Sequence, residues 1–424
     1  MTSSARTAQL QAAPARAIGW RAMLAIFGPG LIVMLADTDA GCLITAAQSG
    51  AQWGYAMVLP QLVLIPSLFM AQEITVRLGV ATQKGHGQLI KEQFGFGWGL
   101  VSAGTLAVSA IGALLTEFAG IAGVGELFGV SKWLTIPVAT LALCAVGLLG
   151  SYRRAEKIGI IVGLAQLFFV PAMIFAHPSF GDLAANFAKL PLTHPNYVYL
   201  LAANVGAVIM PWMIFYQQTA VIDRGLKPAD LVRERRDTAV GSLITQGVMI
   251  VVIVTLAATV WKHGGASALN TVGDIANALT PYLGHESASV LVGLAILGGA
   301  LVAALVVSLA GSWGLSEVLG WKHSLNQKLG RDNWKFYLVY ILTHVLGAVV
   351  VMVSANLVQL AVGVEAMNAL LLPLVLGFLL ALEAKALPKR FRMKGVYRWV
   401  VTGLCLIVMA FGLFMVPETI GITF

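Results

Sequence analysis

Long apolar segments constrain the fold of this chain more than any other sequence feature. A bilayer core about 30 Å thick is crossed by roughly 20 apolar residues in a helix, and the chain holds eleven such segments. The connectors between them are short and leave no room for a soluble domain. We therefore expect an all-α membrane protein with 11 transmembrane helices, near residues 22–48, 54–79, 99–127, 133–151, 157–177, 197–222, 239–262, 287–318, 335–355, 357–384 and 396–416.

The composition supports this fold class. Hydrophobic residues make up 58% of the chain and charged residues 11%, with a mean hydropathy of +0.84, whereas soluble domains carry about 25% charged residues. No small-residue cleavage site follows the first segment, so we interpret it as a retained helix and not a signal peptide. Residues 1–21 are small and polar and are expected to be disordered. The three cysteines are scattered and favour neither a disulfide framework nor a zinc site.

The distribution of charge predicts the orientation in the membrane. The net charge is +8, and nearly all of the 27 Lys and Arg residues lie in the N-terminal tail and in every second connector. This alternation follows the positive-inside rule. It predicts a multi-pass protein of the cytoplasmic (inner) membrane with its N terminus in the cytoplasm and its C terminus outside, and it argues against a nucleic-acid partner. No feature of the sequence indicates an oligomeric state.

Two apolar segments contain helix breakers beside polar groups at mid-depth. The first segment carries "ADTDAG", with Gly41, and the sixth carries "AVIMPW", with Pro211. These places correspond if residues 22–177 and 197–384 form two five-helix repeats of opposite orientation, with 396–416 as an added helix. Carriers built from inverted repeats bind substrate between two such broken helices. The alternative is that both residues only kink packed helices.

Asp37 and Asp39 need compensation at this depth. Each costs roughly 2.5–3.5 kcal/mol on insertion scales, and a bound cation or protonation of one member would supply it. Two residues are about 200° apart on a helix, so unwinding at Ala40 and Gly41 is expected to turn both carboxylates inward. Broken helices also free backbone carbonyls, which are tolerated where they line a cavity or meet an ion.

Four stretches resemble the NRAMP divalent metal transporters. They are "GPGLIVMLADTDAG", the segment from "QSGAQWGYAMVLP" to "LIKEQFG", "VGAVIMPWMIFYQQTAVIDRG" and "AGSWGLSEVLGW", and the similarity runs from about residue 22 to 416. The resemblance implies a five-plus-five inverted repeat, as in amino-acid transporters, that carries a divalent metal by alternating access, and it implies neither a cofactor nor enzymatic activity.

The resemblance also implies a set of metal ligands. The family pattern Asp-Pro-Gly-Asn reads here from Asp39 to Cys42, and Ala-x-x-Met-Pro-His reads from Ala207 to Trp212. The carboxylate of Asp39, the sulfur of Met210 and the carbonyls of Ala36 and Ala207 carry over, whereas Cys42 replaces an asparagine and Asp37 and Glu365 add charge. Each residue also has a purely structural interpretation. Cys42 would be a small buried hydrophobic residue and Met210 a packing residue, and Asp37 and Glu365 would be structural carboxyl groups.

The proton-handling residues of the family are altered in this chain. Trp212 and Gln217 stand where the family has histidines, and Glu117 alone matches the acidic residues of helix three. A relay needs linked histidines and carboxylates, so we expect proton coupling to be weak or absent. The pattern resembles the NRAMP-related magnesium transporters. Added carboxylates suit Mg²⁺, whereas Met210 and Cys42 suit softer metals, so a site for Mg²⁺ and Mn²⁺ is expected.

Two other functions are less consistent with the sequence. An ion-coupled symporter of an amino acid or another organic solute would share the fold, but the two aspartates would repel a substrate carboxylate. An intramembrane hydrolase is disfavoured because HExxH, GxSxG and GxGxxG do not occur in a workable setting.

Other charged and polar residues of the apolar segments are given structural roles. Glu73 is predicted to pair with Arg77, four residues on, and His344 is predicted to be a hydrogen-bonded core residue. Glu317 and Glu383 are expected to be solvated near helix ends, and residues 83–97 to form an amphipathic surface segment or a loop.

Overall fold

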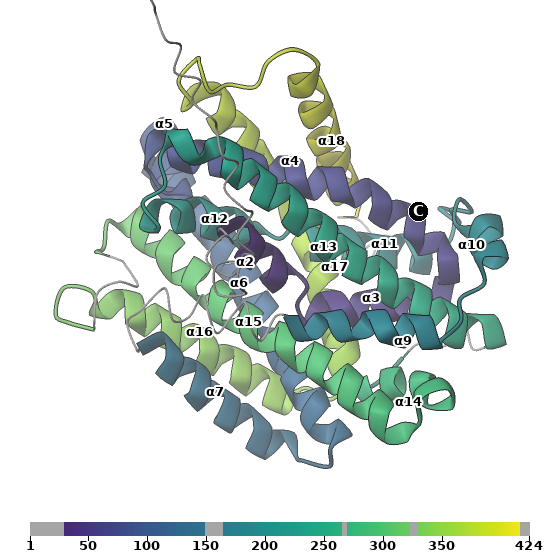
Figure 1. The fold of residues 1–424 in the computed structure, drawn as a ribbon. Coiled ribbons are helices and arrows are strands. Elements are labelled where there is room, and N and C mark those ends of the chain that lie inside the picture. The colour runs from purple at the N-terminus through teal and green to yellow at the C-terminus, as the bar shows by residue number, and fades with distance from the viewer. Residues whose placement is uncertain (1–28, 149–163, 265–268, 323–328, 416–424) are drawn as a thin grey trace, which may run out of the picture.

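Helices are the regular elements of the described part of this protein. The computed structural model describes residues 29–148, 164–264, 269–322 and 329–415, and no strand occurs within these ranges (Figure 1). The predicted tail 1–21 lies outside them, as do the start of the 22–48 segment and the junction between segments 133–151 and 157–177. The all-α fold class is confirmed for the described residues.

The helices vary widely in length, and two predicted spans are each divided into two helices. In chain order the α-helices are α2 (Pro29–Asp37), α3 (Ala40–Trp53), α4 (Val58–Thr82), α5 (His86–Phe94), α6 (Phe96–Leu127), α7 (Lys132–Leu148), α9 (Phe169–Phe175), α10 (Phe180–Asn186), α11 (Pro195–Val208), α12 (Pro211–Asp223), α13 (Leu231–Thr259), α14 (Val272–Leu283), α15 (His285–Leu319), α16 (Trp334–Val353), α17 (Leu357–Lys385) and α18 (Gly395–Phe414). Short 3₁₀ turns are η1 (Gly54–Met57), η2 (Leu164–Phe168), η3 (Pro228–Asp230) and η4 (Trp261–His263).

Eight helical stretches in the described residues are long and apolar enough to cross a membrane, or nine if the bent pair Leu164–Phe175 and Phe180–Asn186 is one span. The protein is therefore a multi-pass membrane protein. The exact number of eleven spans stays a prediction, because α2 is short and residues 149–163 lie outside the described ranges. The eight stretches are Ala40–Thr82, Phe96–Leu127, Pro195–Asp223, Pro228–His263, His285–Leu319, Trp334–Val353, Leu357–Lys385 and Gly395–Phe414.

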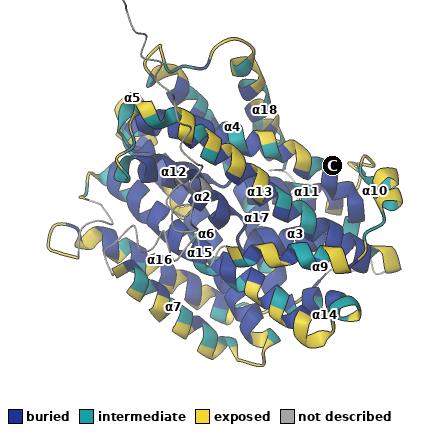
Figure 2. Ribbon diagram, in the orientation of Figure 1, coloured by how far each residue is buried: buried dark blue, intermediate teal, exposed yellow. Residues whose placement is uncertain are grey.

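The two divided spans lie in the interior of the bundle. Helix α6 packs along α15, α11 packs along α17, and α13 covers α2, α3 and α4 (Figure 1). The outer helices α7, α16 and α18 expose apolar faces, with Leu141 72% and Trp399 77% exposed, while the central helices are buried (Figure 2). Apolar side chains on the outer surface and polar side chains in the interior are expected of a helix bundle surrounded by lipid.

The structure also describes three features predicted away from the breaks: an ion pair, a core histidine and the segment 83–97. The predicted ion pair of Glu73 and Arg77 is confirmed, and Glu73 also pairs with Arg235 at 2.9 Å. His344 is buried and its Nδ1 lies 2.9 Å from the carbonyl of Tyr340, which confirms the core reading. Within residues 83–97, the segment His86–Phe94 is helical.

The expectation for Glu317 and Glu383 is wrong. Both acids are buried, because other segments cover the ends of their helices. The segment leading into α5 lies over Glu317, whose Oε2 accepts a hydrogen bond from the N–H of Gly87 at 3.0 Å. The connector before α18 covers Glu383, which accepts from the N–H of Met393 at 2.6 Å.

Candidate functional site

The first break lies between α2 and α3, slightly earlier in the chain than expected. Helix α2 ends at Asp37 and α3 begins at Ala40, so Thr38 and Asp39 form the break, whereas Gly41 is already helical. The position follows from capping. Asp39 has an extended backbone and its Oδ1 accepts a hydrogen bond from the N–H of Cys42 at 2.7 Å, which satisfies a donor that a helix N-terminus otherwise leaves unpaired.

The break removes the helical partner of the Ala36 carbonyl. In a continuous helix the N–H of Ala40 would bond to that carbonyl. Here the N–H of Ala40 donates instead to Oε2 of Glu117 on α6, at 3.2 Å. Glu117 therefore lies at the N-terminus of α3, where the helix dipole favours a negative charge.

The second break, between α11 and α12, frees the carbonyl of Ala207. Proline has no N–H, so Pro211 at the start of α12 cannot bond to the residue four positions earlier. Ile209 and Met210 leave the helical conformation, with ψ values of 83° and 139°. The carbonyl of Ala207 instead accepts a hydrogen bond from the thiol of Cys42 at 3.1 Å. This bond joins the two breaks directly.

Glu365 lies between the two broken spans. A Cβ on Gly41 would lie 2.2 Å from Oε1 of Glu365, and a Cβ on Gly206 would lie 1.9 Å from its carbonyl oxygen. The absence of side chains at these two glycines therefore lets α17 approach both α3 and α11. The other carboxylate oxygen of Glu365 accepts from Asn368 at 3.1 Å.

Buried carboxylate oxygens without a donor gather around the breaks. Asp37, Asp39 and Glu365 are at most 1% exposed. The two aspartates border the break between α2 and α3, and Glu365 lies beside Gly41. Among the described residues, no N–H or hydroxyl group donates a hydrogen bond to either oxygen of Asp37, to Oδ2 of Asp39 or to Oε1 of Glu365. Buried polar groups are normally paired, so these four oxygens call for a bound cation or for protonation.

The acids that the structure describes at the breaks do not form a closed ligand cage. Within the described ranges, no group of three or more His, Cys, Asp or Glu side chains is arranged to hold a metal ion. A cation at the breaks would therefore also need oxygen atoms from the backbone or from water. The carbonyl oxygens of Ala36 and Ala207 are suitable ligands for hard cations.

The two sulfur atoms predicted as ligands both have protein partners. Met210 Sδ accepts a hydrogen bond from Nε1 of Trp212 at 3.0 Å, and Cys42 donates its S–H to Ala207. Gln217, singled out in the sequence as a possible proton-handling or gating residue, donates to Thr238 on α13 at 3.1 Å, so its amide NH2 group is directed toward α13.

Several polar residues near the first break were not singled out from the sequence. Nε2 of Gln166, in η2, donates to the carbonyls of Leu35 and Thr38 at 2.9 and 2.5 Å, and Thr245 donates to Met34 at 2.5 Å. These bonds fix the carboxyl end of α2. A lone glutamine in an apolar run was the available signal for Gln166.

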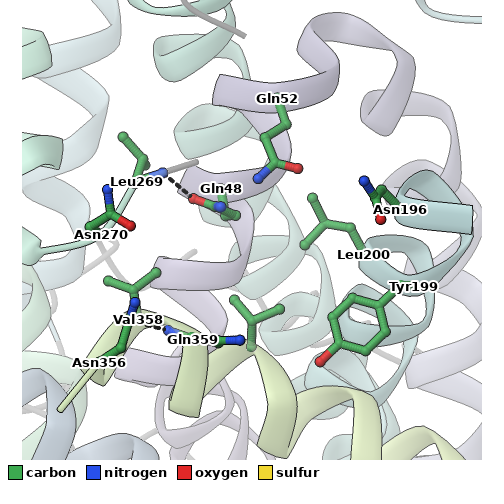
Figure 3. Close-up of a pocket in the computed structure, with 11 residues that line it drawn as sticks. Gln48, Gln52, Asn196, Tyr199, Leu200, Leu269, Asn270, Asn356, Val358 and Gln359 are labelled. Atoms are coloured by element: carbon green, nitrogen blue, oxygen red, sulfur yellow. Dashed lines mark hydrogen bonds between the residues drawn. The ribbon is translucent and has the colours of Figure 1, made fainter. Parts of the chain in front are cut away.

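A cavity of about 380 Å³ opens at the far end of α3 from Asp39. Figure 3 shows side-chain amides from several segments around it, with Gln48 accepting from the N–H of Leu269 at 2.8 Å. The acids of the breaks do not line it, so this cavity is not itself the candidate site. The lining residues are uncharged and are Gln48, Gln52, Asn196, Tyr199, Leu200, Leu269, Asn270, Asn356, Val358, Gln359 and Val362.

Comparisons with known proteins point to one family. Residues 30–417 match the family model described as natural resistance-associated macrophage protein-like. A divalent metal cation transporter, MntH 1, of Pseudomonas aeruginosa is 26% identical over 315 residues, which cover 71% of each chain. The solved structure of a manganese transporter from Eremococcus coleocola has a TM-score of 0.74 at 17% identity and covers 94% of this chain and 87% of that one. A Na⁺-coupled sialic acid symporter has a TM-score of 0.61 at 13% identity, covering 92% and 90%.

Proposed function

The chain belongs to the natural resistance-associated macrophage protein-like family, and from this premise we propose that it transports divalent metal cations of the Mg²⁺ and Mn²⁺ type across the cytoplasmic membrane. The names of its relatives, a divalent metal cation transporter and a manganese transporter, support the substrate class.

The unpartnered carboxylate oxygens at the two breaks carry this proposal. Burying an anion is costly unless a cation or a proton compensates it. Asp37, Asp39 and Glu365 hold four such oxygens beside the bond that links α3 to α11. A divalent cation would neutralise two charges at once, with the carbonyls of Ala36 and Ala207 as further ligands.

The described acids and carbonyls at the breaks are arranged openly, which suits a partly hydrated ion. Mg²⁺ gives up its water reluctantly and commonly binds through a few carboxylates. An open arrangement of acids and carbonyls would leave room for retained water. In this proposal Asp39 is the central ligand, and Asp37 and Glu365 contact the ion directly or through water.

Transport would proceed by alternating access of two inverted repeats, 22–177 and 197–384, with a helix at 396–416 outside them. The breaks at Asp39 and Met210 are the proposed hinges. The cavity beside Gln48 would be the access route from outside if the N terminus is cytoplasmic. Since two histidine positions of the family are Trp212 and Gln217 here, proton coupling is proposed to be weak or absent.

A symporter of an organic solute is the second candidate, because a sialic acid symporter shares the fold. The buried acids argue against an anionic substrate, since they would repel it in the place where such carriers bind a carboxylate. An uptake panel of amino acids and sugars beside metal ions separates the two candidates.

Transport in proteoliposomes tests the proposal. We expect saturable uptake of Mg²⁺ and Mn²⁺ by the unmodified protein and a loss of at least tenfold in Asp39→Ala. Asp332→Ala is the matched control, because Asp332 lies on the surface and pairs only with Lys322 among the described residues. Equal uptake by Asp39→Ala and the unmodified protein would refute the proposal.

A further inference from the structure

The hydrogen bonds around the breaks divide the predicted ligands by chemical type. Among their side chains, the atoms that no described residue pairs by a hydrogen bond are carboxylate oxygens, on Asp37, Asp39 and Glu365. Both sulfur atoms, in contrast, are engaged with other protein groups. Oxygen ligands select hard cations, and thioether sulfur selects softer ones such as Cd²⁺.

The bond to Met210 comes from the side chain two residues later. Met210 is outside a helix and Trp212 is in the first turn of α12, so the extended backbone at Met210 brings the indole N–H to 3.0 Å from the sulfur. Both side chains are fully buried, and water does not compete for this bond. A hydrogen bond inside a low-dielectric interior is stronger than the same bond in water.

A hydrogen bond to a thioether reduces its strength as a metal ligand. The sulfur has lone pairs that accept either a proton donor or a metal ion, and the indole N–H occupies one of them and withdraws electron density from the sulfur. Indole donates only and cannot itself bind a metal. The cost of displacing the indole falls on any metal that uses the sulfur, whereas a metal that uses only oxygen ligands does not bear it.

We propose that Trp212 is a specificity-determining residue, which withholds the sulfur of Met210 from the ion and so shifts selectivity from soft divalent cations toward hard ones. The inference rests on the proposed function, because it assumes that the ion binds at the breaks. Trp212 acts through Met210 and is a positioning residue.

Phenylalanine at position 212 removes the N–H donor and keeps an aromatic ring in the buried site. In Trp212→Phe we expect the affinity ratio of Cd²⁺ to Mg²⁺, measured by calorimetry on the purified full-length protein, to rise about fivefold, the worth of an ordinary hydrogen bond. The affinity for Mg²⁺ itself should change little, which a merely structural role of Trp212 would not predict.

Two controls isolate the bond. In a Met210→Leu background, Trp212→Phe should leave the Cd²⁺ to Mg²⁺ ratio unchanged. Trp53→Phe makes the same substitution at the end of α3, where no described residue accepts a hydrogen bond from the indole, and it should also leave the ratio unchanged.

The outcomes distinguish the inference from the function on which it rests. An unchanged ratio in Trp212→Phe, with both metals still bound, overturns the inference and leaves metal transport standing. A rise that persists in the Met210→Leu background also overturns it, because the effect then does not pass through the sulfur. Binding of neither metal by any variant, the unmodified protein included, overturns both.

Discussion

Asp37 and Asp39 differ in what their side chains do at the first break. Oδ1 of Asp39 caps α3 through the N–H of Cys42, and only Oδ2 lacks a donor among the described residues. Neither oxygen of Asp37 has one. Asp39 therefore contributes to the fold as well as to the proposed site, whereas Asp37 contributes charge without a compensating bond.

This difference predicts opposite effects of Asp37→Asn on stability and on metal binding. Removing an uncompensated buried charge should raise the free energy of unfolding of the metal-free protein by about 2 kcal/mol, while Mg²⁺ affinity should fall about tenfold. Thermal unfolding with and without Mg²⁺ measures both effects. Asp39→Asn is the comparison, because asparagine also caps helices. A metal-free Asp37→Asn protein less stable than the unmodified one would contradict this account.

His86, outside the candidate spans, predicts a pH dependence of stability. Burial lowers the pKa of His86 to about 4, and the hydrogen bond with Gln218 opposes this shift only in part. The unfolded chain, with a pKa of about 6.5, binds more protons between these values, so stability is lost as pH falls from about 6.5 to 4. The loss should reach about 3 kcal/mol, and His86→Gln should remove most of it. Unfolding midpoints of the two proteins across this pH range provide the measurement, and parallel curves would exclude His86 as the cause.

Sequence reasoning located the acids at the breaks but not their hydrogen bonds. Asp39 and Pro211 are visible because charge and proline are rare inside apolar segments. The break fell at Thr38 and Asp39 and not at Ala40 and Gly41, since side-chain capping by Asp39 decides where α3 begins. The Trp212 bond to Met210 depends on the extended backbone between them, which no periodicity in the sequence reveals.

Helix α12 is tied to the segment before α5 by buried polar contacts. Glu317 on α15 accepts hydrogen bonds from Thr219 on α12 and from the N–H of Gly87. Gln218 on α12 donates to the carbonyl of Lys84 at 2.8 Å. Since α12 follows the second break, any tilt of this helix must disrupt these contacts. They form a latch on the side of the bundle predicted to face the cytoplasm.

Weakening the latch should loosen this end of the protein. Glu317→Gln keeps the size of the side chain but replaces one carboxylate oxygen with an NH2 group and removes the negative charge. The NH2 group donates and does not accept, so one of the two hydrogen bonds loses its present acceptor. We expect backbone hydrogen exchange in peptides covering residues 83–95 to accelerate several-fold. Glu92→Gln lies in the same segment and disrupts an exposed pair with Lys84, and exchange there should change little. Equal acceleration in both variants would show that the latch has no special role.

The internal divisions of the spans are harder to predict than their apolar character. Hydropathy identifies stretches such as α6 and α15 reliably because they are long and continuous. It does not show that η1 joins α3 to α4 with little interruption, nor that the predicted first and sixth segments each consist of two helices. Those features depend on capping and on proline placement, which act over a few residues and leave the mean hydropathy unchanged.

At the scale of the whole molecule, the proposed function predicts a voltage-driven carrier. Transfer of two positive charges into an inside-negative vesicle gains about 4.6 kcal/mol at 100 mV, which corresponds to an accumulation of about a thousandfold or more at equilibrium. In the proposed function, Trp212 and Gln217 stand in place of the family's histidines, and the ion is expected to cross without a proton. We therefore expect Mg²⁺ uptake into proteoliposomes to increase when valinomycin and a potassium gradient make the interior negative, while an internal pH dye stays constant. Collapsing the potassium gradient is the control, because it leaves the protein and the metal gradient unchanged. Uptake that ignores the potential, or that acidifies the vesicle in step with the metal, would mean that the acids at the breaks exchange protons during each cycle.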